Sequence, residues 1–275
     1  MKILQVTDVH FVPAGETLHG LDPRARLDAC IADINAHHQD AAMCFITGDL
    51  AHAGQVGAYE NLKDCLSRLK VPYVVMVGNH DSRKDLLSVF PDTAVDENGF
   101  VQTVVDLEVG RCILLDTVLL NAGKGENWGE FCERRAAWLE ARLEEARGRP
   151  IFLFLHHPPF DISLPSLDNI RLRDTGPLTR VLSKASGIRH MFLAHVHRPV
   201  SGSWRGIPFS IFRGTNHQVP FDLDTISPVP KSHEPPAYGV IFLTPESVVI
   251  HAHDYLDRSA LPLPDTARKI GNAKS

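Results

Sequence analysis

The stretch Ile3-Leu4-Gln5-Val6-Thr7-Asp8-Val9-His10 is a short apolar run that ends directly in acidic and imidazole side chains. It is the first of several such runs, and their pattern along the chain decides the fold class. Short runs rich in β-branched and apolar residues indicate β-strands. Further runs of this kind occur at 43–47, 73–77, 112–115, 151–155 and 191–193. Between them, apolar residues recur at helical spacing in 24–37, 59–69 and 129–147. This alternation predicts an α/β fold.

The last third of the chain has a different texture. Residues 207–212, 238–244 and 247–251 are predicted to be strands. Between the first two of these runs, residues 220–236 contain five prolines, which exclude a regular helix or a central strand. We expect this stretch to be a long loop or arm over one end of the sheet, and the polar tail from Asp257 to be poorly ordered unless it docks on a partner.

Composition excludes several classes of protein. With 44% hydrophobic residues in 275 the chain is too apolar to be disordered, yet no apolar run approaches the ~20 residues of a membrane span. Thr7 and Asp8 interrupt the N-terminal apolar stretch, so it does not read as a secretory signal. A net charge of −5 argues against a surface for polyanions. Five scattered cysteines are typical of a reducing compartment, so we expect a cytoplasmic protein.

Histidine is the unusual residue, with 15 in the chain, and many of these follow the apolar runs. The residues directly after the runs are Asp8-Val9-His10, Gly48-Asp49, Gly78-Asn79-His80-Asp81, His156-His157 and His195-Val196-His197. We expect five strands of one sheet to bring these side chains together at their carboxyl ends, where open α/β sheets bind ligands.

Such a cluster suits a pair of divalent metal ions. Carboxylates buried in one pocket repel one another, and carboxylates and imidazoles both lose hydration on burial, a cost that bound cations can offset. Gly48 and Gly78 allow the backbone to turn sharply close to the ions. Since none of these motifs contains cysteine, a structural thiolate zinc site is excluded, and the mixed donors suit Mn, Fe, Co or Zn equally.

The order of these motifs resembles that of the calcineurin-like metallophosphoesterase superfamily, over residues 8–197. The resemblance implies a four-layer α/β/β/α sandwich with two divalent metal ions per chain. It places Asp8, His10, Asp49 and His197 on one metal, with Asp49 bridging to a second metal. That second ion would be completed by Asn79, His156 and His195, while His80 would face the phosphate. Ala194 stands where the family has a glycine before His195.

Within that superfamily, residues 48–54 and 214–220 resemble the bacterial class III cyclic-nucleotide phosphodiesterases and glycerophosphodiesterases. The resemblance implies hydrolysis of small phosphodiesters by in-line attack of a metal-bound hydroxide. It divides the chain into a core at 1–200, further strands at 201–255 with a cap arm at about 218–237, and a tail at 256–275. The cap implies a homo-oligomer. A phosphomonoesterase, a nuclease and a non-catalytic scaffold remain alternatives, although the acidic balance disfavours a polynucleotide substrate.

Several site residues have open roles at this stage. His80 is the candidate that stabilises the phosphate and protonates the leaving group. Asp81 either orients His80, holds its turn or caps the next helix. His217 either contacts substrate or makes a backbone hydrogen bond. Seven further histidines are interpreted as structural or surface residues, namely His37, His38, His52, His157, His233, His251 and His253.

Overall fold

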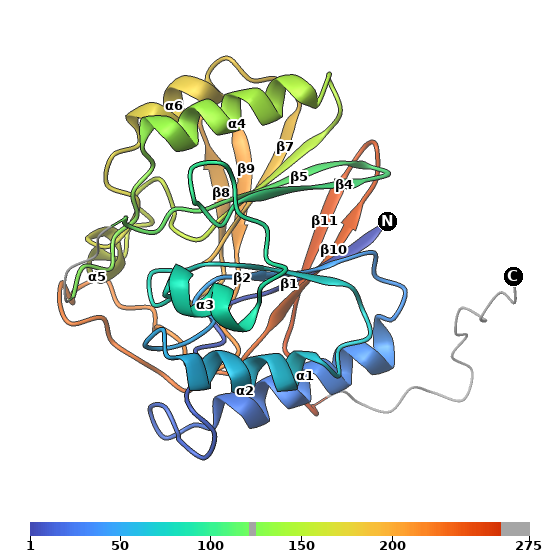
Figure 1. The fold of residues 1–275 in the computed structure, drawn as a ribbon. Helices are drawn as coiled ribbons and strands as arrows, with labels where there is room; N and C mark the ends of the chain where they lie inside the picture. The colour runs from blue at the N-terminus through green and yellow to red at the C-terminus, as the bar shows by residue number, and fades with distance from the viewer. Residues whose placement is uncertain (121–124, 260–275) are drawn as a thin grey trace, which may run out of the picture.

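Two mixed β-sheets pack face to face, and helices cover both outer faces of the pair (Figure 1). The computed structural model describes residues 1–120 and 125–259. The predicted α/β/β/α sandwich is therefore confirmed. The predicted tail at 256–275 lies almost entirely outside the described residues.

The first sheet has the strand order β11-β10-β1-β2-β3. Its strands are β1 (Lys2–Val6), β2 (Cys44–Thr47), β3 (Tyr73–Met76), β10 (Tyr238–Leu243) and β11 (Val248–His253). The first three run parallel, whereas β10 is antiparallel to β1 and to β11. The parallel strands therefore end at the same edge of this sheet.

The second sheet has the order β4-β5-β6-β7-β9-β8. Its strands are β4 (Thr103–Leu107), β5 (Gly110–Leu115), β6 (Ile151–Leu155), β7 (Ile188–Leu193), β8 (Val200–Trp204) and β9 (Ile207–Ile211). Strands β5, β6, β7 and β9 are parallel, and an antiparallel strand closes each side.

Helices α1 (Pro23–His37) and α2 (Val56–Leu66) lie on the first sheet, and α4 (Glu133–Glu145) and α6 (Gly176–Leu182) lie on the second (Figure 1). Two shorter helices are α3 (Arg83–Val89) and α5 (Pro165–Asp168). Asp22 begins α1, because its side chain accepts the free N–H groups of Arg24 and Ala25. Ser82 caps α3 in the same way, with its side chain accepting from the Asp85 N–H.

Three apolar layers hold the sandwich together. Alternate residues of one strand face different layers, so that Ile3 packs between the sheets while Leu4 packs against the helices. In the layer between the sheets, the ring of Phe154 packs on that of Phe45 and stacks on that of Phe192. Because both faces of these strands are covered, they read in sequence as continuous apolar runs.

One feature of the predicted topology is wrong. The motif-bearing strands do not share one sheet, because β1, β2 and β3 belong to the first sheet and β6 and β7 to the second. Their ends meet because the two sheets pack with those edges at the same end of the molecule. The predicted helix at 59–69 starts and ends earlier, as α2, and α3, α5, α6, β4 and β8 were not predicted.

Residues 220–236 form no helix or strand, and a single bridge between Gln218 and Ser232 closes the base of this arm. All five cysteines are free thiols, four of them buried. Among the described residues, no helix combines the length and apolar content needed to cross a membrane.

Candidate metal centre and its histidine rim

The ends of five strands bring the predicted metal ligands together from both sheets. Asp8 and His10 follow β1, Asp49 follows β2, and Asn79 follows β3. From the second sheet, His156 follows β6, while His195 and His197 follow β7. Side chains nearly 190 positions apart in the chain therefore share one buried volume.

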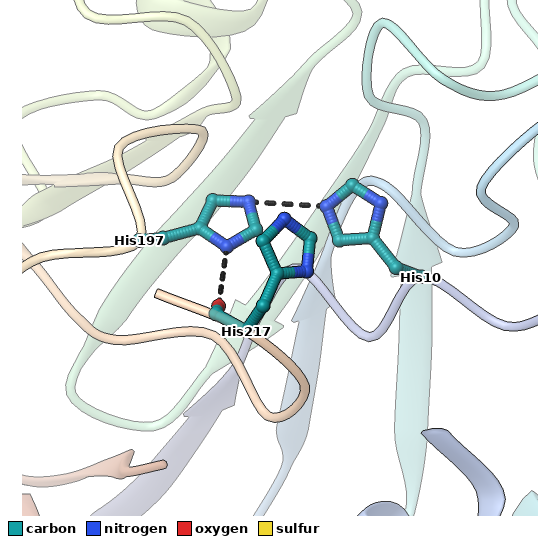
Figure 2. A group of neighbouring side chains, drawn as sticks. All are labelled: His10, His197 and His217. Carbon is teal, nitrogen blue, oxygen red and sulfur yellow. Dashed lines mark hydrogen bonds between the residues drawn. The ribbon is translucent and has the colours of Figure 1, made fainter. Parts of the chain in front are cut away.

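The first group of ligand atoms comes from Asp8, His10, Asp49 and His197. One donor atom from each of these four buried residues lies within 4.8 Å of the others. His197 Nε2 is 3.3 Å from Asp8 Oδ1, and His10 Nε2 is 3.4 Å from Asp49 Oδ2. The two Nε2 atoms of His10 and His197 are only 3.0 Å apart (Figure 2).

The second group surrounds the other oxygen of Asp49. His156 Nε2 is 3.4 Å from Asp49 Oδ1 and 3.2 Å from Asn79 Oδ1. The His195 ring lies 5.2 Å from that of His156, between ring centroids. Asp49 thus presents one carboxylate oxygen to each group, which is the arrangement a bridging ligand requires.

The backbone is strained at these positions. Asp8, His10 and Asp49 have φ values of 51°, 46° and 50°, and His195 and His197 have 70° and 52°. Residues other than glycine rarely adopt this left-handed conformation, and where they do, it is often at functional sites. Five of the seven predicted ligands share this feature, because the chain must turn sharply past each strand end to aim its side chains inward.

Glycines provide the space for this packing. A Cβ at Gly48, whose φ is +97°, would overlap His156 Nδ1, and one at Gly78 would overlap Asp49 Oδ1. Gly214 also lies against the site, less tightly, and a Cβ there would be 3.0 Å from the Cβ of Asp8. Any side chain at Gly48 or Gly78 would therefore displace a predicted ligand.

The hydrogen bonds around the ligands fit a divalent cation. His197 Nδ1 donates to the His217 carbonyl at 2.8 Å (Figure 2), and His156 Nδ1 donates to the Thr47 carbonyl at 2.9 Å. These bonds fix the tautomer and direct the Nε2 lone pairs toward the carboxylates, as in metal-binding histidines. The Nε2 atom of His195 is buried without a hydrogen-bond partner among the described residues, an arrangement that a bound cation would satisfy.

The ionisation of the cluster supports the same fit. Burial by itself raises the pKa of the Asp49 carboxyl, but the surrounding imidazoles, with His156 the strongest, hold that pKa well below its usual range. Burial lowers the pKa of His156, but Asp49 outweighs it and raises the pKa to about 9. Burial and His156 lower the pKa of His195 to about 3. A carboxylate paired with a proton-holding imidazole is a site where a cation can replace the proton.

His80 and Asp81 have different surroundings. His80 donates its Nδ1 proton to the His52 carbonyl at 2.6 Å, which leaves its Nε2 available to another partner. The Asp81 carboxylate instead accepts the N–H groups of Leu50, Ala51 and Gly78, at 3.0, 2.9 and 2.8 Å.

Of the three roles left open for Asp81, the structure therefore favours holding the turn. Its carboxylate ties the loop after β2 to the loop after β3, and Tyr59 also donates its hydroxyl to it at 2.9 Å. Ser82, rather than Asp81, caps α3. Burial raises the pKa of the Asp81 carboxyl to about 6.

Three further histidines lie next to the cluster, and we call them the histidine rim: His52 and His217 pack on His10, and His19 packs on those two. The His217 ring lies 4.9 Å from the ring of His10 and 4.6 Å from that of His197 (Figure 2). The His52 ring stacks on His80 at 4.9 Å and lies 5.4 Å from His10. The His217 carbonyl accepts the hydrogen bond from His197 Nδ1, and the His217 ring packs on the rings of His10 and His197. A substrate contact by this ring stays a prediction.

Sequence reasoning missed two members of the rim. His52 was interpreted as structural, although its place three residues after Asp49 was a usable signal. His19 had no signal, because only the folded chain brings it 4.6 Å from the His217 ring. Burial and then the charge of Lys231 lower the pKa of His19.

Other histidines lie as predicted for structural residues. His157 binds Thr117 Oγ1 at 2.7 Å through Nδ1 and faces the Asn127 carbonyl at 3.3 Å through Nε2, so both ring nitrogens are occupied. His253 Nε2 lies 3.0 Å from Asp33 Oδ2, a residue of α1.

Known structures share this fold. A dimetal phosphatase from Danio rerio aligns over 93% of this chain and 96% of its own, with a TM-score of 0.68 and 15% identity. A purple acid phosphatase from yellow lupin aligns over 93% of this chain and 52% of its own, with a TM-score of 0.67 and 13% identity. At such identities the likeness concerns the fold alone.

Sequence relatives extend over nearly the whole chain. A probable cyclic nucleotide phosphodiesterase of Rhodopseudomonas palustris is 44% identical and covers 93% of both chains. The 3′,5′-cyclic adenosine monophosphate phosphodiesterase of Escherichia coli is 30% identical over 83% of this chain and 82% of its own. A probable glycerophosphodiester phosphodiesterase of Arcobacter nitrofigilis is 28% identical over 96% of both chains. Residues 1–199 match the calcineurin-like phosphoesterase family, and the chain belongs to that family.

Proposed function

We propose that the protein is a metal-dependent phosphodiesterase that hydrolyses small diesters, either 3′,5′-cyclic nucleotides or glycerophosphodiesters. The observation that supports this most directly is the Asp49 carboxylate, which turns one oxygen toward His10 and the other toward His156. Relatives named for both substrate classes align with more than four fifths of the chain.

Two divalent ions fit the donors. One would be held by Asp8, His10, Asp49 and His197, and the other by Asp49, Asn79, His156 and His195. Bound there, the ions would supply Lewis-acid activation of water and neutralise the phosphate charge. Mn, Fe, Zn and Co all suit this mixed set of imidazole, carboxylate and amide donors.

The residues of the chain orient the diester. His80 is held by its Nδ1–H bond to His52 and by its backbone N–H, which donates to Asp49 Oδ1 at 3.0 Å. Its Nε2 would therefore meet the phosphate or the departing alkoxide when the imidazole is protonated. His217 lies where it would contact the same phosphate from the His10 side. Asp81 does not contact the diester itself; it fixes the turn that presents Asn79 and His80.

The arm is the proposed surface for a homo-oligomer. Phe221 and Ile226 are each 66% exposed and Leu223 is 53% exposed, which is unusual for large apolar side chains within one short loop. Replacing Phe221 and Ile226 by serine would then lower the oligomeric mass measured by light scattering. An unchanged mass would remove the arm from the interface.

The free thiols favour a reducing compartment, so we place the activity in the cytoplasm.

Turnover of bis(p-nitrophenyl) phosphate and p-nitrophenyl phosphate, compared in Mn²⁺, tests the reaction class. The proposal predicts faster turnover of the diester. Asn79→Ala should lose most of that activity together with part of the bound manganese, whereas Asn98→Ala, remote from the cluster, should keep both. Faster turnover of the monoester would overturn the substrate class, and no turnover of either would favour a non-catalytic scaffold. A panel of cyclic nucleotides and glycerophosphodiesters then separates the two diester classes.

A further inference from the structure

A tight turn at His19 and Gly20 presents an imidazole to the rim of the candidate site. Leu18 and Leu21 exchange backbone hydrogen bonds of 2.8 and 3.0 Å across the turn. The two central residues, His19 and Gly20, have φ values of 53° and 78°. Turns with two left-handed central residues favour Asn, Asp or Gly at the first position. Histidine is not among these residues. Although it adopts positive φ more often than most side chains, its use at this position calls for a reason outside the turn.

The strained residues of the chain point to that reason. Nine residues other than glycine have positive φ in the described chain, namely Asp8, His10, His19, Asp49, Arg147, Ser163, His195, His197 and Arg205. Five of them are the proposed metal ligands, and His19 packs on two histidines that contact one of those ligands, His10. Strain that persists at one site is typical of residues held for function.

The His19 ring is one imidazole farther from the ligands than the other rim residues. It lies 4.6 Å from the ring of His217 and 5.9 Å from that of His52, and both of those rings pack on His10. Within residues 1–120 and 125–259, neither ring nitrogen of His19 has a hydrogen-bond partner. The exposed imidazole is therefore free to bind something that arrives from solvent.

The arm holds this turn in place. His233 Nε2 donates to the His19 carbonyl at 2.8 Å, and His233 Cε1 lies 4.0 Å from where a Cβ of Gly20 would be. The base of the arm is fixed by two backbone hydrogen bonds between Gln218 and Ser232, of 2.9 and 2.8 Å. Since Gln218 follows His217 and Ser232 precedes His233, this base also ties the two histidines to each other.

We propose that His19 contacts the alcohol portion of the diester, beyond the phosphate, and that His233 sets its position through the His19 carbonyl. This inference rests on the phosphodiesterase function proposed above. His19 lies beyond the rings that face the phosphate, so its N–H or lone pair meets a hydroxyl of the ester group. The ligand chemistry is that of a polyol or a ribose. His19 is thus a substrate-contacting specificity residue, and His233 is a positioning residue.

The variant His19→Asn tests the contact without breaking the turn, because asparagine tolerates positive φ. Its melting temperature should equal or exceed that of the wild type. Its KM for a hydroxyl-bearing diester should rise about tenfold, the size of one lost hydrogen bond. The Kd of the product phosphomonoester, measured by calorimetry, should rise with it. Turnover of bis(p-nitrophenyl) phosphate, which has no hydroxyl, should fall by less than turnover of the hydroxyl-bearing diester. Every measurement on the exposed control His251→Asn should match the wild type.

A double-mutant cycle tests His233. His233→Ala should raise the same KM, and His233→Gln, which keeps a side-chain N–H donor, should restore it in large part. Because His233 acts through His19, His19→Asn/His233→Ala should be no worse than His19→Asn alone. Additive effects would overturn the positioning role.

Two outcomes separate the inference from the function on which it rests. Wild-type KM and Kd values in His19→Asn, in an enzyme that hydrolyses diesters, would overturn the inference alone. Failure of the wild-type protein to hydrolyse any diester would overturn the proposed function and the inference with it.

Discussion

Arg83 forms a bidentate ion pair with Asp116 that joins the two halves of the sandwich. Arg83 Nε lies 2.7 Å from Asp116 Oδ2, and Arg83 Nη2 lies 2.6 Å from Oδ1. Arg83 begins α3, three residues after His80, whereas Asp116 directly follows β5 of the second sheet. The pair therefore fixes the loop that carries Asn79 and His80 against the opposite sheet.

Asp116→Asn should destabilise the protein strongly. Asp116 is fully buried, and it also accepts the N–H groups of Val101 and Val118, at 3.0 and 2.9 Å. Breaking a buried pair leaves an uncompensated charge and costs about 3–5 kcal/mol. Chemical denaturation measures the change. The control is Glu133→Gln, which removes an exposed pair with Arg180 and should leave the unfolding free energy nearly unchanged.

Asp49→Asn should remove metal and activity together. The asparagine has one carbonyl oxygen and no charge, so it cannot serve both the His10 and the His156 groups. Because changes beyond the metal ligands already cost roughly 10–100-fold, the loss of diesterase rate should exceed about 100-fold. Elemental analysis measures the bound manganese, and Asp222→Asn, on the exposed arm, is the control.

Thermal unfolding checks the same site without measuring enzymatic activity. Chelation of the wild type should lower its melting temperature, and Mn²⁺ should restore it, since a ligand at about 100 times its Kd adds about 2.7 kcal/mol. Asp49→Asn should show little of this response. A full response in the variant would contradict the bridging role.

Asp81→Asn should weaken the fold rather than remove a catalytic group. An amide keeps only one acceptor oxygen, so at least one of the three N–H groups that Asp81 receives would lose its partner. An unsatisfied buried donor costs about 1–3 kcal/mol. Denaturation at neutral pH measures this loss. A loss of activity with no change in the unfolding free energy would instead indicate that Asp81 has a catalytic role.

His190→Gln should change how stability depends on pH. Burial lowers the pKa of His190 to about 4, from 6.5. The unfolded chain therefore binds more protons between those values, so His190 makes the protein less stable as pH falls from 6.5 toward 4. The full span amounts to about 3 kcal/mol. The glutamine side chain would not titrate but would still reach the Ser210 hydroxyl, which lies 3.0 Å from His190 Nε2.

Unfolding free energies at pH 7 and pH 4, both in chelator, measure this effect. Histidines of the metal centre then titrate alike in wild type and variant, so the difference between them reports His190. The exposed His251→Gln should match the wild type at both pH values. A wild-type pH dependence in His190→Gln would contradict the prediction.

The identity of the side chains at the site, and their order along the chain, could be predicted from local sequence alone. Asp8, Asp49 and His156 each follow a buried strand, and a strand buried on both faces is legible as an unbroken apolar run. The motifs predicted to bind metal lie directly after such runs, so local composition was enough to locate them. The absence of a helix or central strand in the Pro-rich arm could also be predicted locally, because proline restricts its own φ angle and lacks a backbone N–H.

The way these pieces meet depends on tertiary packing. Sequence reasoning put the motif-bearing strands in one sheet, whereas packing divides them between two, since strand partners are chosen by contacts across the whole chain. The positive φ of Asp8 and Asp49, the turn-holding role of Asp81 and the place of His19 also depend on neighbours remote in sequence. Long-range packing fixes these features, and no local pattern of residues encodes it.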